Sequence, residues 1–135
     1  MDFYSRLFAE KLGGGSRKGD ELFKLTVSDN LTVLTEKMFV SNGITKIGSS
    51  AFRGCTSLTS VEIPNSVTSI GSAAFYGCSR LKSVKVWANI PPSLGDNAFV
   101  YTPSGLRIYV PSGSVNAYKA ATNWKNYASK IYRVN

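Results

Sequence analysis

The chain has 135 residues, a length typical of one domain, and its hydrophobic fraction of 43% is ordinary for a folded protein. It carries 16 Lys and Arg against 8 Asp and Glu, a formal net charge of +8. The sequence has no histidine, the commonest metal ligand and acid–base residue. No apolar run reaches about 18 residues, so no membrane-spanning helix is predicted.

The N-terminal residues have an aromatic-rich amphipathic pattern that predicts a helix over 1–12. Gly13-Gly14-Gly15 ends this helix and begins a linker over 13–20. Two interpretations stay open: the helix covers the open end of the region that follows, or it anchors the chain to another protein, in a larger assembly or a homo-oligomer. The apolar residues of this candidate assembly anchor are Phe3, Tyr4, Leu7, Phe8 and Leu12.

The next segment, Glu21 to Val40, is rich in β-forming residues and predicts two or three strands. Asp29-Asn30 is a good turn between Leu25–Val27 and Leu31–Val33. We expect these strands to lead into the repeated part of the chain.

Two segments, 48–70 and 71–94, repeat each other at a spacing of 23 residues, so that Ala51-Phe52 recurs as Ala74-Phe75. A short fixed period is typical of a solenoid. We therefore expect an α+β fold: a short right-handed solenoid over 21–111, with coils of about 23 residues and a strand on one face.

Weaker copies flank the two clear repeats. Backward, Met38 and Val40 fall at the positions of Val61 and Ile63, and forward, Ala98-Phe99 fits with one inserted residue near Asn89. We expect equivalent phenylalanines to stack as a buried aromatic ladder, namely Phe52, Phe75 and Phe99.

Short strands within Leu58–Ile63 and Leu81–Val86 should point alternate residues inward and outward. The outward residues would form columns across the coils, with Trp87 as an added exposed aromatic. The candidate ligand-binding face comprises Phe39, Ser60, Glu62, Ser83, Lys85, Trp87, Arg107 and Tyr109.

The string AFxGCxxLxSVxIPxSVTSIGxxAF resembles the BspA-like leucine-rich repeat, a bacterial surface-antigen type, over roughly Ile44 to Val110. The segment Ile108 to Ile131 is similar to the closing segment of such arrays. The resemblance implies a surface or secreted protein that binds host proteins, cells or other ligands without catalysis, and it supplies no shared catalytic residues.

The last segment, 112–135, is predicted to be a C-terminal helical cap. Ser114 is a good N-cap for a helix over Val115 to Ala121. Four large side chains should plug the end of the solenoid: Tyr118, Trp124, Tyr127 and Ile131.

Cys55 and Cys78 occupy equivalent places in consecutive coils, which puts their Cα atoms on the order of 5 Å apart. A disulfide is geometrically conceivable, but we favour two small core residues stacked on each other. Two cysteines without histidine do not indicate a zinc site.

Residues 48–135 carry nine Lys and Arg against two acids, Glu62 and Asp96, which lie in different parts of their repeats. No catalytic, cofactor or metal site is indicated. The basic excess is explained most simply as a solvated face that keeps the protein soluble, and the alternative is a surface that attracts polyanions such as acidic glycans. The expected partner is a protein or an acidic glycan. No nucleic-acid-binding motif accompanies it.

We therefore expect a non-enzymatic binding or attachment module that recognises a protein or glycan on a cell surface. The alternative is a structural decoration or fibre-type subunit of a larger particle, such as a phage virion, docked by its N-terminal helix. The start of the chain lacks the pattern of a signal peptide, which predicts that the protein stays inside the cell or leaves it by lysis or assembly. The setting therefore stays open between the bacterial cell surface, which the resemblance implies, and the surface of a virion or other particle.

Overall fold

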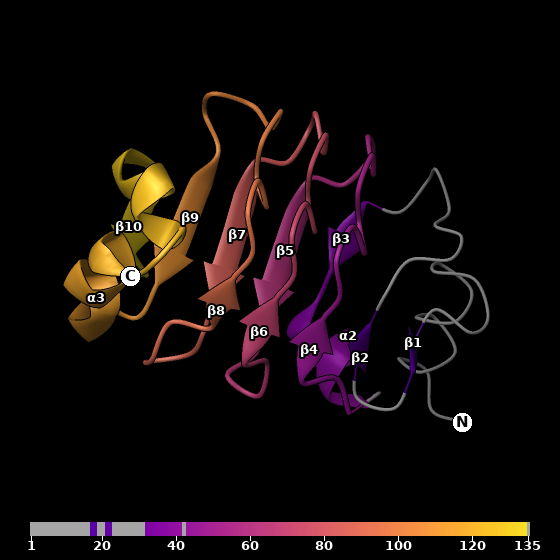
Figure 1. Cartoon of the computed structure of the whole chain (residues 1–135), viewed down its shortest axis with the longest axis horizontal. Helices are drawn as coiled ribbons and strands as arrows, with labels where there is room; N and C mark the ends of the chain where they lie inside the picture. Colours follow the sequence, from indigo (N-terminus) through magenta and orange to yellow (C-terminus); the bar gives the residue numbers. More distant parts are fainter. Residues whose placement is uncertain (1–16, 19–20, 23–31, 42, 135) are drawn as a thin grey trace.

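The computed structural model describes residues 17–18, 21–22, 32–41 and 43–134. Coils stacked side by side form a solenoid-like repeat, with the chain advancing from one end of the stack to the other (Figure 1). The predicted helix over 1–12 with its anchor residues, the triglycine and the turn at Asp29-Asn30 lie outside the described residues.

Two five-stranded sheets run along the stack, and every strand pair in them is parallel except the β1–β2 pair. The short-strand sheet consists, in spatial order, of β1 (Arg17–Lys18), β2 (Glu21–Leu22), β4 (Lys46–Ile47), β6 (Ser69–Ile70) and β8 (Ser93–Leu94). The long-strand sheet consists of β10 (Ile131–Arg133), β9 (Arg107–Val110), β7 (Ser83–Val86), β5 (Ser60–Ile63) and β3 (Val33–Leu34). The helical elements are α2 (Glu36–Ser41), η1 (Ser112–Ser114), α3 (Val115–Ala120) and η2 (Trp124–Lys130).

The strand register confirms the repeat. Ser60 pairs with Ser83 at the predicted spacing of 23, whereas Lys85 pairs with Tyr109 at 24 because of the inserted residue in the β7–β8 loop. Strands β5 and β7 alternate between buried and half-buried residues, as a strand packed on one face must.

The predicted aromatic ladder is present in the core. The ring centroids of Phe52 and Phe75 lie 5.3 Å apart, and those of Phe75 and Phe99 lie 5.5 Å apart, with nearly parallel planes. All three side chains are buried. Identical side chains thus stack on their predecessors at the spacing of the coils.

Hydrogen bonds also join the coils along the path that returns from one sheet to the other. Phe52 N–H donates to Ala74 O at 2.7 Å, and one coil later Phe75 N–H donates to Ala98 O at 2.9 Å. At Gly71 the coils approach so closely that a Cβ atom would lie 2.5 Å from the backbone nitrogen of Ser49. Glycine is therefore required where consecutive coils touch backbone to backbone.

The segment after β9 packs on the last phenylalanine of the ladder. The Phe99 ring lies 6.2 Å from that of Trp124 and 5.3 Å from that of Tyr127. Tyr118 and Trp124 are fully buried, and the predicted helix is α3. Ser114 is the N-cap residue of α3, as predicted, but its side chain makes no capping hydrogen bond: its Oγ donates instead to Asn89 O at 2.7 Å.

The first coil departs from the predicted register, in which Met38 aligned with Val61. In the structure Leu34 pairs with Val61, a spacing of 27, and the extra residues form α2 where strands were expected. Phe39 is fully buried on this helix. Within the expected linker over 13–20, Arg17–Lys18 form strand β1.

Cys55 and Cys78 are both buried thiols, and Cys78 Sγ donates to Phe52 O at 3.1 Å. They are small core residues, as favoured from the sequence. None of the helices in the described part of the chain is long and apolar enough to cross a membrane.

Candidate functional site

The outer face of the long-strand sheet gathers most of the predicted ligand-binding residues. The register places Ser60, Ser83 and Arg107 side by side in one column. A neighbouring column contains Glu62, Lys85, Tyr109 and Tyr132. Phe39 does not belong to this face, because the α2 helix turns its ring into the core and leaves it inaccessible to a ligand.

Aromatic and basic side chains meet over β9 and β10. The rings of Tyr109 and Tyr132 lie 6.2 Å apart, and the Arg107 guanidinium carbon lies 4.9 Å from the centre of the Tyr132 ring. A guanidinium over an aromatic face is held by the ring quadrupole. The two aromatic side chains and the arginine therefore form one cluster on the surface.

Beside this cluster the sheet face is hollowed. A shallow depression of about 380 Å³ is lined by Ser83, Lys85, Tyr109 and Val134. We call it the Tyr109 hollow. Its walls combine an ammonium group, a phenol and a hydroxyl, which can receive a carboxylate and hydrogen-bond its neighbours.

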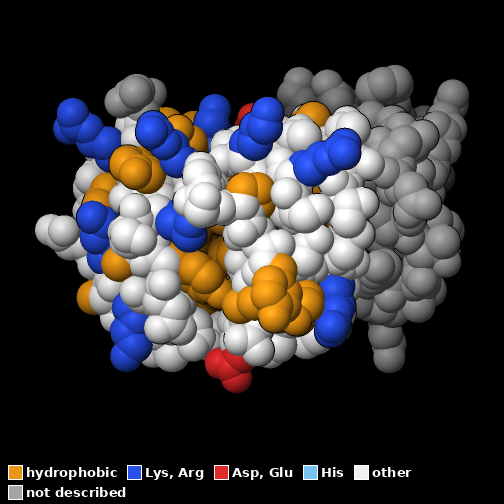
Figure 2. Space-filling view, turned by 90° about the horizontal axis from the view of Figure 1, so that it is seen from above, with side chains coloured by type: hydrophobic (Ala, Val, Ile, Leu, Met, Phe, Trp, Pro, Cys, Tyr) orange, Lys and Arg blue, Asp and Glu red, His pale blue; other side chains and the backbone are white. Residues whose placement is uncertain are grey.

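The charge of the face changes along the stack. Glu62 is the acidic residue of strand β5, whereas the following strands contribute Lys85 from β7 and Arg107 from β9. The view onto the turns that precede β5, β7 and β9 shows Lys and Arg side chains across the surface with little acidic surface among them (Figure 2). The β7–β10 half of the face is therefore the half that attracts anions.

Trp87 continues the strand ladder one residue beyond β7, with its N–H donating to Ile63 O at 3.0 Å. It is half-buried rather than exposed. Its indole Nε1 is buried and has no hydrogen-bond partner among the described residues. Trp87 therefore offers a ring edge to the surface rather than a polar group, and it is not part of the Tyr109 hollow.

Tyr132 was not predicted as a site residue, because its segment was assigned to the end of the array. The signal was present in the sequence: Ile131-Tyr132 repeats Ile108-Tyr109 at a spacing of 23. The structure pairs these two segments residue by residue as parallel strands. The parallel strands of the repeat thus extend one strand beyond the solenoid predicted over 21–111.

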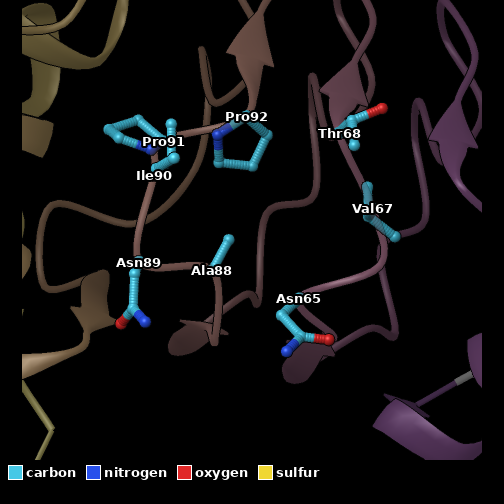
Figure 3. Close-up of a pocket in the computed structure, with 8 residues that line it drawn as sticks. All are labelled: Asn65, Val67, Thr68, Ala88, Asn89, Ile90, Pro91 and Pro92. Atoms are coloured by element: carbon cyan, nitrogen blue, oxygen red, sulfur yellow. The ribbon is translucent and has the colours of Figure 1, made fainter.

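A second depression lies between the turn after β5 and the β7–β8 loop, at the end of the coils opposite to the turns that precede β5 and β7 (Figure 3). It measures about 390 Å³, and its lining contains no charged residue: Asn65, Val67, Thr68, Ala88, Asn89, Ile90, Pro91 and Pro92. Ile90 is 83% exposed there. This depression can take a neutral apolar group, in contrast to the Tyr109 hollow.

The described residues contain no group of three His, Cys, Asp or Glu side chains that could hold a metal ion. Glu62 lies on the long-strand sheet and Asp96 follows β8 on the return path, so these two acids do not share a site. The side chains of the face offer charge, aromatic stacking and hydrogen bonds to a ligand.

No curated protein matches this sequence. Residues 28–126 match the sequence model described as BspA type leucine rich repeat region (6 copies). That match spans most of the chain, including all strands from β3 to β9 and the α3 helix. The chain therefore belongs to the BspA-type leucine-rich repeat family, whose members are generally protein-interaction or surface modules.

Proposed function

We propose that this chain is a non-enzymatic attachment module that binds an anionic partner, either an acidic protein segment or an acidic glycan, through the outer face of β7, β9 and β10. The observation that carries this proposal is the cluster of Arg107, Tyr109 and Tyr132 on one sheet face, beside the hollow that Lys85 and Tyr109 line.

Each group has a distinct part in such binding. Lys85 lies directly beside Tyr109 in the register, so a carboxylate near its ammonium group would bring the adjoining part of the ligand onto the phenol ring. Arg107, stacked on Tyr132, would contact a second acidic group. A ligand with repeated acidic groups would therefore engage both cations.

The sheet lowers the entropic cost of binding. Lys85, Arg107 and Tyr109 project from strands whose inward residues are fully buried, so their backbones are ordered before a ligand arrives. Side chains on a rigid element lose less freedom on binding than the same side chains on a loop. Glu62 would repel an acidic ligand from the β5 end of the face and so fix its position.

The test measures binding to two probes, a poly-glutamate peptide and a hyaluronate oligosaccharide, by calorimetry. The variant K85E/R107E should weaken binding of at least one probe by about tenfold or more, since both cations become repulsive. The matched control is K119E/K125E, which makes the same change in net charge at exposed residues of the C-terminal segment. Equal losses in the two variants would mean that only the overall charge attracts the ligand.

Salt gives an independent check on the same probes. Raising the ionic strength from about 0.05 M to about 0.5 M should weaken binding steeply, because the exposed charges become screened. Binding that does not respond to salt would contradict an anionic ligand.

The alternative function is a structural subunit of a larger particle, docked by the predicted helix over 1–12. The pattern of Phe3, Leu7 and Phe8 before a triglycine supports it. Deleting residues 1–15 should then release the protein from the particle fraction while the coils remain folded. Full retention of the truncated protein in that fraction would exclude this docking.

A further inference from the structure

Three side chains from consecutive coils form a row at the turn end that precedes β5, β7 and β9. The Arg53 guanidinium carbon lies 4.4 Å from the centre of the Tyr76 ring, and the rings of Tyr76 and Tyr101 meet edge to face at 5.1 Å. We call these three residues the tyrosine ridge. Figure 2 looks onto this end of the coils and shows hydrophobic side chains gathered at the surface between basic ones.

Tyr101 has a backbone conformation that glycine adopts at the equivalent positions of the two preceding coils. Its φ is +59°, in the left-handed region, where the equivalent residues of the two preceding coils are Gly54 and Gly77, with φ values of +72° and +75°. A bulky residue in this region is strained. The array therefore places tyrosine at a position where glycine would fit better.

Burial does not compensate for this strain, because the Tyr101 side chain is 71% exposed. Among the residues that the structure describes, its ring contact is the edge-to-face contact with Tyr76. Backbone strain that is retained at an exposed aromatic residue points to function rather than stability.

Hydrogen bonds between neighbouring coils fix the backbone of the ridge. Gly54 N–H donates to Tyr76 O at 2.8 Å, and Gly77 N–H donates to Val100 O at 2.9 Å, so the backbone beneath both tyrosines is fixed to neighbouring coils. The Thr102 hydroxyl donates to Phe99 O at 2.7 Å and holds the residue after Tyr101. Tyr101 is thus a fixed platform whose ring faces solvent.

The surroundings of the ridge are rich in hydroxyl groups and poor in acids. Thr56 and Ser79 are exposed and occupy equivalent positions just after the left-handed residues Gly54 and Gly77. The tyrosines add two phenol hydroxyls that can donate or accept. Neither hollow described above includes a ridge residue.

We propose that the tyrosine ridge is a second binding site, separate from the Tyr109 hollow, and that it takes a neutral sugar unit of a glycan. The flat C–H face of a pyranose ring carries partial positive charge and stacks on the negative face of an aromatic ring. The sugar stacks on Tyr101, and its hydroxyls bond to the Tyr76 and Ser79 hydroxyls. An open convex site with one exposed ring fits this ligand better than it fits a protein side chain, which requires a pocket.

The experiment uses cellohexaose and chitohexaose, two neutral β-1,4-linked oligosaccharides, titrated into the full chain with NMR detection of the Tyr101 amide. At least one should bind and shift this signal, with little change at about 0.5 M salt because neither probe is charged. Y101F should bind like the parent, since the ring is kept. Lys119→Ala, at an exposed residue of the C-terminal segment, should also bind like the parent.

The decisive variant is Y101G, which restores the residue found at the two equivalent positions. It should weaken sugar binding by about tenfold or more, while the melting temperature rises by about 2–5 °C as strain is relieved. Because this variant is expected to be more stable, loss of binding cannot be attributed to unfolding.

Several outcomes would overturn the proposal: no binding of either oligosaccharide, full binding by Y101G, or a lower melting temperature in Y101G. Loss of poly-glutamate binding in Y101G would also overturn it, because the ridge would then belong to a protein-binding surface. Failure of the Tyr109 hollow to bind anionic probes would not contradict the proposal for the tyrosine ridge, since the ridge is tested with neutral probes and different variants.

Discussion

The two central coils and the C-terminal segment are held by different kinds of contact. In residues 48–94 the same contact recurs at the same position of each coil, as in the stack of Phe52 on Phe75. In residues 111–130 the side chains instead make contacts that are specific to this segment. Tyr118 Oη donates to Ala88 O and Trp124 Nε1 donates to Pro92 O, both at 2.7 Å.

This difference marks where the repeated contacts end and where the contacts specific to the C-terminal segment begin. Each coil packs against the next coil through the same contacts. The last coil has no following coil, so its aromatic ring would be uncovered and its carbonyl groups would lack donors. The C-terminal segment covers Phe99 with Trp124 and Tyr127 and donates to the carbonyls of the β7–β8 loop. The predictions below separate these two kinds of stabilisation, beginning with the largest effect.

Replacing Phe75 by Ala should remove the middle of the ladder and destabilise the protein by about 3–5 kcal/mol. Phe75 stacks on Phe52 and Phe99 at once and is fully buried, so the cavity cannot be filled from solvent. Urea denaturation followed by circular dichroism measures the loss. The control is Ser79→Ala in the same coil, which is exposed and should change stability little. A loss below about 1 kcal/mol in Phe75→Ala would contradict a packed ladder.

Replacing Gly71 by Ala should destabilise the protein by about 1–3 kcal/mol, because the new Cβ would overlap the backbone of the preceding coil. The colliding atoms belong to Gly48 and Ser49 and cannot rotate away. Gly113→Ala is the matched control, since no atom lies within 4 Å of its ideal Cβ position. Equal melting temperatures for the two variants would show that the coils are not in backbone contact at Gly71.

Replacing Tyr118 by Phe should destabilise the protein by about 1–2 kcal/mol. The phenol donates to Ala88 O at 2.7 Å in a buried environment, and phenylalanine would leave that carbonyl without its donor. Tyr132→Phe, at a residue 41% exposed, is the control. If both variants unfold at the parental urea concentration, the hydrogen bond contributes nothing to the closure.

The smallest effect is a dependence of stability on alkaline pH. Burial raises the pKa of the Tyr118 phenol above its ordinary value near 10, so the folded protein keeps a proton that the unfolded chain loses. Stability is therefore unaffected by this group below about pH 10 and falls above it. Tyr118→Phe should fall less steeply than the parent between pH 10 and 11. Identical slopes in the two proteins would contradict the buried phenol.

The part of the fold that repeats could be predicted from the sequence, and the part that does not repeat could be predicted only partly. The spacing of 23 residues placed Phe52, Phe75 and Phe99 in one line and set the β5–β7 register. The same spacing misplaced Met38, because the first coil contains a helix. Thr35-Glu36, a typical helix start, was the available signal.

The candidate site likewise contains residues that follow the repeat and residues that do not. Lys85 and Tyr109 were placed together by the period, and the structure pairs them. Tyr132 and the ring stacking of Arg107 depend on a strand outside the recognised repeats. Phe39 was assigned to the face by extending the period through a segment that does not follow it. The role of Ser114 depended on where the Asn89 carbonyl lies in space, which no local pattern reveals.

The most direct test of the proposed function is an NMR titration of isotope-labelled protein with the anionic probe that binds more tightly, either poly-glutamate or the hyaluronate oligosaccharide. The account predicts that the amide signals of Lys85, Tyr109 and Tyr132 shift most, because these residues are neighbours on the outer face of the long-strand sheet. Shifts confined to Lys119 and Lys125, or spread evenly over all basic residues, would contradict a defined site on that face.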